Sequence, residues 1–228
     1  MQVGEALAKI SYALRGLDDI APTFGDEEAI YWLSVLNSKK DEYAQDIKQR
    51  WADNFDIRQL TDPVASGTQE YSLDTSFLAP SDEIYVVDSD GKKHYFTVIK
   101  PQQRPRYGSN EVYISSVNPK KLTFVNEISA TSPLIGGQIF APGYYRPDDM
   151  TTETSILPFS DPNWGVIASA AEIAFNDVVY ETKAADLTGK ANELYRNMAK
   201  ANRALTYANG RRAAYNTSSF RITSPGRR

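Results

Sequence analysis

Apolar residues recur at helical spacing in the N-terminal quarter of the chain. A first stripe predicts an amphipathic helix that ends near Gly16, and its members are Val3, Leu7, Ile10, Leu14 and Leu17. A loop with Pro22 and Gly25 follows, in which Thr23 or Asp26 can cap a second helix of roughly 25 residues. The stripe of this second helix consists of Ile30, Leu33, Leu36, Tyr43, Ile47 and Trp51. The short connection predicts a helical hairpin.

Between about Thr61 and Pro147 the period of the apolar positions changes from that of a helix to that of a strand. The strand-like segments are QEYSL, EIYVVDSDGKKHYFTVI, EVYIS, KLTFV and GGQIFAPGYYR, separated by clusters of Pro, Gly and Asn. Asp90 and Gly91 predict a tight hairpin turn within the second segment. The stretch SVNPKKLTF predicts another chain reversal.

Helical spacing returns after the sequence LPFSDPNWG. Asp161 followed by Pro162 predicts a capped helix start, and one face then carries Val166, Ile167, Ala170, Ile173, Ala174 and Val178. A last helix is expected from about Ala184 to the Asn209-Gly210 pair, which is typical of a helix end. Its apolar positions are Leu187, Ala191, Leu194, Tyr195, Met198, Ala201 and Leu205.

The order of these elements predicts an α+β protein. Neither helix pair can bury its apolar stripe alone, so we expect the two pairs to pack together as a four-helix bundle with an inserted antiparallel β domain. The expected parts are an N-terminal helical pair at 1–58, the β-rich insertion at 59–158 and a second helical pair at 159–208. An extended, basic C-terminal arm is expected at 209–228.

The arm stands out by its charge. The chain holds 25 basic and 29 acidic residues, a formal net charge of -4. Eight of the basic residues and no Asp or Glu lie from Leu194 onward, which leaves 17 basic residues against all 29 acidic ones in the remainder. The arm suggests binding to nucleic acid, to an anionic membrane or to a groove on another protein. Because aromatic and aliphatic residues alternate with arginines, the protein groove is favoured. The candidate partner-binding residues are Arg211, Arg212, Tyr215, Phe220, Arg221, Ile222, Arg227 and Arg228.

Catalytic and metal-binding patterns are missing from the sequence. Without Cys there is no disulfide and no thiolate site, and the single histidine, His94, has no second His or Cys to complete a metal site. No phosphate-binding glycine motif occurs. The acidic pairs sit at helix starts and turns, where Asp and Glu are expected anyway; they are Asp18-Asp19, Glu27-Glu28, Asp148-Asp149 and Asp88 with Asp90. We therefore expect a protein that is not an enzyme and that holds neither a metal nor a cofactor.

The N-terminus, the lengths of the apolar runs and the tyrosine content add two further expectations. The N-terminus has no signal-peptide pattern and no apolar run approaches 18 residues, so we expect no membrane association and synthesis in a cytoplasm. The 14 tyrosines suit either strands or surfaces that meet a partner, and composition leaves both interpretations open.

The layout as a whole resembles the head-to-tail adaptor (connector, or head-completion) proteins of tailed bacteriophages. The resemblance lies in the pair GEALAKISYALRGL and GDEEAIYWLSVLNSKKDEYAQD, the entry SGTQEYSL, the stretch GGQIFAPGYYRP, and ILPFSDPNWGVIASAAEIAFND leading to KANELYRNMAKANRAL. It implies a structural virion protein in the neck between head and tail, assembled in the host cytoplasm. It also implies a homo-oligomeric ring, commonly twelvefold, whose C-terminal arm docks on the portal protein.

The same resemblance implies that a tail or second neck protein binds the ring, and that genomic DNA passes through its channel without specific binding. An acidic body would let the DNA slide, because it repels phosphate. The alternatives are another neck or tail component, such as a tail terminator or stopper, and a nucleic-acid-binding module.

Overall fold

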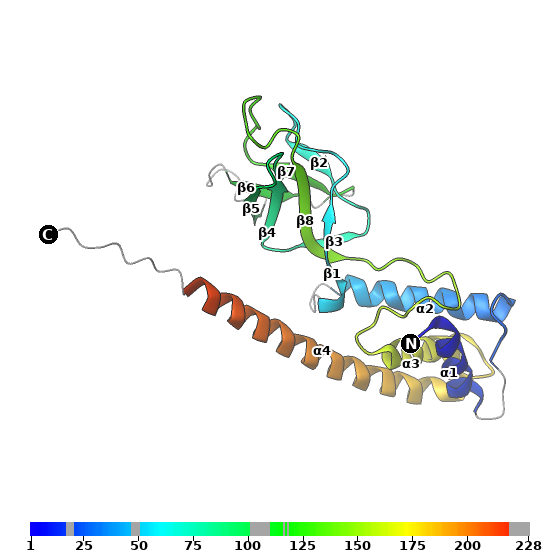
Figure 1. Cartoon of the computed structure of the whole chain (residues 1–228). Coiled ribbons are helices and arrows are strands. Elements are labelled where there is room, and N and C mark those ends of the chain that lie inside the picture. Colours follow the sequence, from blue (N-terminus) through cyan, green and yellow to red (C-terminus); the bar gives the residue numbers. More distant parts are fainter. Residues whose placement is uncertain (17–20, 47–50, 101–109, 116, 118, 219–228) are drawn as a thin grey trace. The chain divides into compact units, whose positions relative to one another are not determined.

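The structure, a computed structural model, describes residues 1–16, 21–46, 51–100, 110–115, 117 and 119–218, with side chains through residue 204. The chain divides into two compact units (Figure 1). Met1–Asp53 and Asp149–Arg228 form one, here called the helical unit, and Asn54–Asp148 form the other, the sheet unit.

Four α-helices build the described part of the helical unit. They are α1 (Val3–Arg15), α2 (Glu27–Gln45), α3 (Pro162–Asn176) and α4 (Glu181–Ser218). Gly16 ends α1 at a φ of 100°, a conformation that favours glycine. Asp26 occupies the N-cap position of α2, but its side chain makes no capping hydrogen bond. Asp161 does cap α3, since its carboxylate accepts a hydrogen bond from the backbone N–H of Asn163, and Pro162 is the first helical residue, as predicted.

Helix α3 is the centre of this unit, and α1, α2 and α4 each pack against it. Buried residues are distributed around most of the circumference of α3. They are Trp164, Gly165, Val166, Ala168, Ser169, Ala170, Ala171, Ile173 and Ala174. A helix that is apolar all round needs neighbours on every side. The predicted four-helix bundle of two packed hairpins, with a purely antiparallel insertion and an extended arm, is therefore wrong. Three helices surround a central one instead, and the β-rich part is a mixed sheet.

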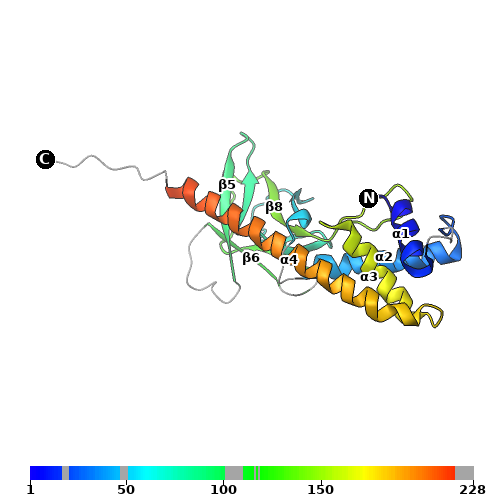
Figure 2. The ribbon, with the colours of Figure 1, turned by 90° about the horizontal axis from the view of Figure 1, so that it is seen from below.

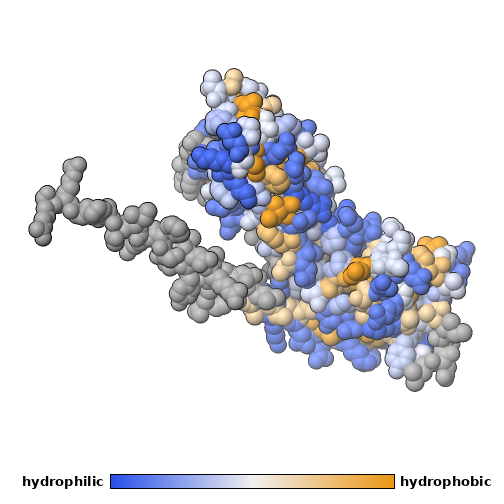
Figure 3. Space-filling model, viewed as in Figure 1, coloured by the Kyte–Doolittle hydropathy of each residue, from blue (hydrophilic) through white to orange (hydrophobic). Residues whose placement is uncertain are grey.

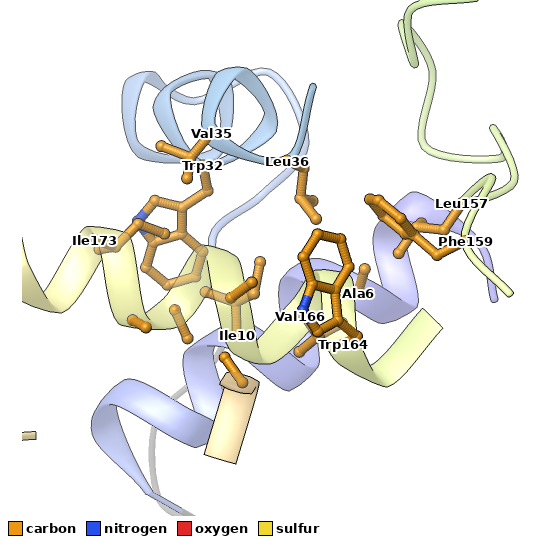
Figure 4. Close-up of a cluster of buried hydrophobic side chains, with 14 of the residues drawn as sticks. Ala6, Ile10, Trp32, Val35, Leu36, Leu157, Phe159, Trp164, Val166 and Ile173 are labelled. Atoms are coloured by element: carbon orange, nitrogen blue, oxygen red, sulfur yellow. The ribbon is translucent and has the colours of Figure 1, made fainter. Parts of the chain in front are cut away.

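Large side chains fill the space around α3. Trp32 from α2 lies against Ile173, and Trp164 points toward Leu36 of α2 and toward Phe159 (Figure 4). The segment that leads into α3 is tied to the N-terminal helices. Asn37 donates to the carbonyl of Met150 and accepts from its N–H, at 3.0 and 2.9 Å. Met150, Leu157 and Phe159 of this segment belong to the same core.

The sheet unit contains eight described strands in one sheet that curls into a half-barrel. They are β1 (Phe55–Gln59), β2 (Glu70–Ser72), β3 (Phe77–Pro80), β4 (Glu83–Val87), β5 (Lys93–Ile99), β6 (Glu111–Ile114), β7 (Lys121–Phe124) and β8 (Gln138–Tyr145). Their order is β1-β8-β4-β5-β6-β7-β2, with β3 also paired to β8. Neighbours pair antiparallel except β5 and β6, which run parallel, so the expected antiparallel domain is a mixed sheet.

The two predicted reversals are confirmed by the pairing. Strands β4 and β5 form an antiparallel hairpin with Gly91 at a φ of 79°, and β6 pairs antiparallel with β7. The sheet unit holds its own core, which includes Ile84, Val86, Phe96, Leu122 and Ile139. Each unit therefore has a separate set of buried apolar side chains.

Candidate interaction surfaces

Helix α4 positions part of the predicted partner-binding segment. Its 38 residues span about 57 Å at the rise of an α-helix, whereas α3 spans about 22 Å. Figure 2 shows α4 running alongside α3 and continuing beyond its end. The last buried residue described on α4 is Asn202, whose side chain accepts a hydrogen bond from the N–H of Ala52 at 3.2 Å.

Three of the predicted site residues lie within α4, namely Arg211, Arg212 and Tyr215. The prediction of an extended arm from residue 209 is therefore wrong for residues 209–218, which are helical. A single glycine such as Gly210 costs a helix only about 1 kcal/mol, and the alanines and arginines around it favour the helix. The other predicted residues, Phe220, Arg221, Ile222, Arg227 and Arg228, lie outside the described residues.

A groove of about 490 Å³ runs between α2, α3 and α4 in the helical unit. This α2–α3–α4 groove is lined by Lys39, Glu42, Trp164, Ala168, Ala171, Glu172, Phe175, Thr188, Ala191, Asn192 and Tyr195. Its volume falls in the range of sites that hold small ligands or the anchoring side chains of a partner. The residues come from three separate segments, and only the packing of α2 and α4 on α3 brings them together.

Charged side chains line one side of the groove. The ammonium of Lys39 lies 2.9 Å from a carboxylate oxygen of Glu42 and 2.5 Å from one of Glu172. Burial works to lower the pKa of Lys39, but the hydrogen bonds to Glu172 and Glu42 outweigh it and raise that pKa. With one lysine between two glutamates, this side of the groove carries a formal charge of −1.

Aromatic rings line the groove as well. The rings of Trp164 and Tyr195 lie 5.9 Å apart, and the hydroxyl of Tyr195 donates to Asp46. Trp164 also continues into a buried cluster with Tyr43 and Phe159, at 5.6 and 5.3 Å. These contacts hold both rings in place. The groove is therefore lined by fixed aromatic rings and by three alanines, Ala168, Ala171 and Ala191.

An apolar patch lies at the turn from α3 to α4. Phe175 is 79% exposed, Val178 86% and Val179 77%. Apolar side chains also appear among polar ones on the visible surface of the helical unit (Figure 3). Since Phe175 lines the groove as well, the patch and the groove are continuous. Exposed apolar residues that cluster in this way are typical of surfaces that contact a protein, a membrane or a ligand.

Aromatic contacts between strands β4, β5 and β8 account for several of the tyrosines. Tyr85 on β4 stacks on Phe140 of β8 at 5.2 Å and lies 5.7 Å from Tyr95 on β5. The ammonium of Lys93 lies 4.8 Å from the ring centre of Tyr85. Cross-strand aromatic pairs of this kind stabilise a sheet.

The residues considered for catalysis are placed in turns and ion pairs. His94 on β5 has its Nε2 2.7 Å from Oδ2 of Asp88, whose carboxylate also accepts from the N–H groups of Lys92 and Asp90. These bonds, the one with His94 foremost, lower the pKa of Asp88 and fix the β4–β5 turn. Glu28 pairs with Arg15, and Asp149 pairs with the buried Lys40. Asp18 and Asp19 lie outside the described residues.

Within the described parts of the chain, no three His, Asp or Glu side chains gather as metal ligands would. No helix in those same parts combines the length and the apolar character that crossing a membrane requires. Comparison with models of known protein families and with curated proteins finds no match.

Proposed function

We propose that this protein is a structural head-to-tail adaptor of a tailed bacteriophage, which forms a ring beneath the portal and joins the capsid to the tail. In this proposal the C-terminal segment, residues 209–228, is the part that docks on the portal. The resemblance in the helical pairs and in the GGQIFAPGYYRP stretch is its first support.

The observation that carries the proposal is the length and charge of α4. The helix extends 16 residues past Asn202, its last described core residue, to Ser218. That distance is about 24 Å. The segment beyond residue 208 has five arginines and no acidic residue. A long helix with a basic, aromatic-bearing end suits a contact with another polypeptide, because Arg and Tyr are frequent energetic anchors of protein interfaces.

The exposed apolar surface of the helical unit is a second support. A ring requires that each copy contact its neighbours, and the patch of Phe175, Val178 and Val179 offers apolar area for such contacts. The sheet unit is left to contact a tail or second neck protein in this proposal.

Truncation tests the role of the C-terminal segment. Removing residues 209–228 leaves every described core residue of α4 in place, so the shortened protein is expected to fold, as circular dichroism would verify. It should no longer attach to portal-bearing heads in co-sedimentation. Retention on a DNA column is measured in parallel. Attachment at the full-length level would refute the role of the segment, and a loss confined to DNA retention would favour nucleic-acid binding instead.

Charge reversal gives a finer test. Arg211→Glu with Arg212→Glu is expected to weaken attachment to heads at least about tenfold, since each lost charged hydrogen bond costs about 1.5–3 kcal/mol. The matched control is Arg196→Glu with Arg203→Glu, which makes the same charge change at exposed positions of the same helix. Equal loss in both variants would show a general effect of charge. Native mass spectrometry of the full chain, with and without portal, tests for a closed oligomer.

A further inference from the structure

We infer that the α2–α3–α4 groove binds the C-terminal segment of a second copy of this chain. The inference concerns the same segment as the proposed function but needs no portal. It adds a binding site for the segment on this protein itself, which can hold the segment before the segment meets a portal.

The groove has the two kinds of group that bind an arginine side chain. Glu42 and Glu172 supply carboxylates, which pair with a guanidinium through two parallel hydrogen bonds. Trp164, Tyr195 and Phe175 supply aromatic rings, over which a guanidinium can also stack. The ammonium of Lys39 pairs with both carboxylates. One ammonium leaves acceptor positions on the two glutamates that a guanidinium can use.

Small residues make room for an incoming side chain. Ala168, Ala171 and Ala191 lie between the charged and aromatic positions, and larger residues there would fill the groove. An apolar or aromatic anchor placed over the three alanines would bury its surface against the rings beside it. The groove therefore matches a segment that carries both arginines and aromatic residues.

The C-terminal segment has this composition. Residues 209–228 contain five arginines together with Tyr215, Phe220 and Ile222. They contain no Asp or Glu that the carboxylates of the groove would repel. The charges of groove and segment are thus complementary, and the apolar anchors of the segment meet apolar sides.

A copy cannot fill its own groove with the helical part of this segment, residues 209–218. Helix α4 is continuous from Tyr195, which lines the groove, to Ser218. Arg211 therefore lies about 24 Å, and Ser218 about 35 Å, along the axis from Tyr195. Arg211, Arg212 and Tyr215 therefore reach a groove only on another copy.

This contact joins two different surfaces, so it is directional. One copy gives its C-terminal segment and the next receives it, and repetition produces either a closed ring or an open filament. A portal that binds the segment would compete with the groove, so docking would exchange one contact for the other.

A peptide-binding experiment tests the inference. A fluorescent peptide with the sequence of residues 209–228 is titrated with the protein truncated after residue 208, and binding is followed by fluorescence anisotropy. We expect saturable binding, weakened at least tenfold by Glu42→Gln with Glu172→Gln and also by Phe175→Ala. Phe175 is exposed, so its replacement leaves the core intact even if the double variant folds poorly.

Matched controls separate the site from general charge and exposure. Glu181→Gln with Glu193→Gln removes two exposed carboxylates of α4 that do not line the groove, and Tyr12→Ala removes an exposed aromatic residue of α1. Both should leave binding unchanged. Absence of peptide binding, equal binding by the groove variants, or equal binding of a scrambled peptide would overturn the inference.

Attachment to heads tests the proposed function separately from peptide binding. The full-length Glu42→Gln, Glu172→Gln protein keeps its C-terminal segment and should still attach to portal-bearing heads. If it binds no peptide but attaches to heads, both proposals stand. If it binds no peptide and the unmodified protein attaches to no head, only the groove inference survives.

Discussion

Two glycine-to-alanine substitutions should change the stability of the helical unit in opposite directions. Gly165 lies in α3, where an added Cβ would be 2.3 Å from Cε2 and 2.6 Å from Cδ2 of Phe159. Gly189 lies in α4, where nothing outside its own helix backbone and chain neighbours is within 4 Å of an added Cβ. The same methyl group therefore meets a buried ring at one position and open space at the other.

The magnitudes follow from the helix preference and from the packing. Alanine is favoured over glycine in a helix by about 1 kcal/mol, so Gly189→Ala should stabilise by up to that amount. At Gly165 the same gain is opposed by overpacking, which costs about 1–3 kcal/mol. Phe159 has little freedom to move, because its ring lies 5.4 Å from that of Tyr43 and 5.3 Å from that of Trp164. We expect Gly165→Ala to destabilise by about 1–2 kcal/mol in net terms.

Tryptophan fluorescence during urea unfolding measures this difference. The 3 tryptophans, Trp32, Trp51 and Trp164, are all buried in the helical unit, so the signal reports the unfolding of that unit. Linear extrapolation to zero urea gives the free energy of unfolding of each variant. The two variants should differ by about 2–3 kcal/mol. Equal stabilisation by both would refute the packing of Phe159 against Gly165.

Two further substitutions test individual contacts. Asp161→Ala removes the cap of α3 and should lower the free energy of unfolding in the same assay by about 1 kcal/mol, whereas an unchanged value would mean that the cap contributes nothing. In the sheet unit, the hydrogen bond from Arg58, ahead of the one from the Ile57 N–H, lowers the pKa of Asp56. A carboxyl with a lowered pKa in the folded state stabilises above the unfolded pKa of about 3.9, and this stabilisation is lost as the pH falls through the folded pKa. Arg58→Gln should therefore raise the pKa of Asp56 in an NMR titration and weaken the acid sensitivity of the sheet unit, and an unmoved pKa would contradict the role of Arg58.

Local signals predicted the elements whose formation depends on neighbouring residues. The Asp161-Pro162 start of α3, the end of α1 at Gly16 and the Asp90-Gly91 hairpin all follow from capping and turn chemistry within a few residues. Strands β1 and β3 were not predicted because buried and exposed positions do not alternate along them: β1 is exposed at four of its five positions, and only Phe77 is buried in β3. The end of α4 was misplaced because Asn209-Gly210 resembles a helix stop, while the helix formers around it carry the helix to Ser218.

The sequence alone determined the four helices, most of the strands and where the charge lies, because these depend on residue type and spacing along the chain. Only the tertiary structure decided that α3 is surrounded by three helices, that β5 and β6 run parallel, and that Lys39, Glu172 and Tyr195 line one groove. An apolar stripe shows that a face is buried but not which element covers it. Alternation likewise predicts a strand without giving its direction or its neighbour. Such features arise from contacts between segments far apart in the chain, and the packing of all the elements together selects them.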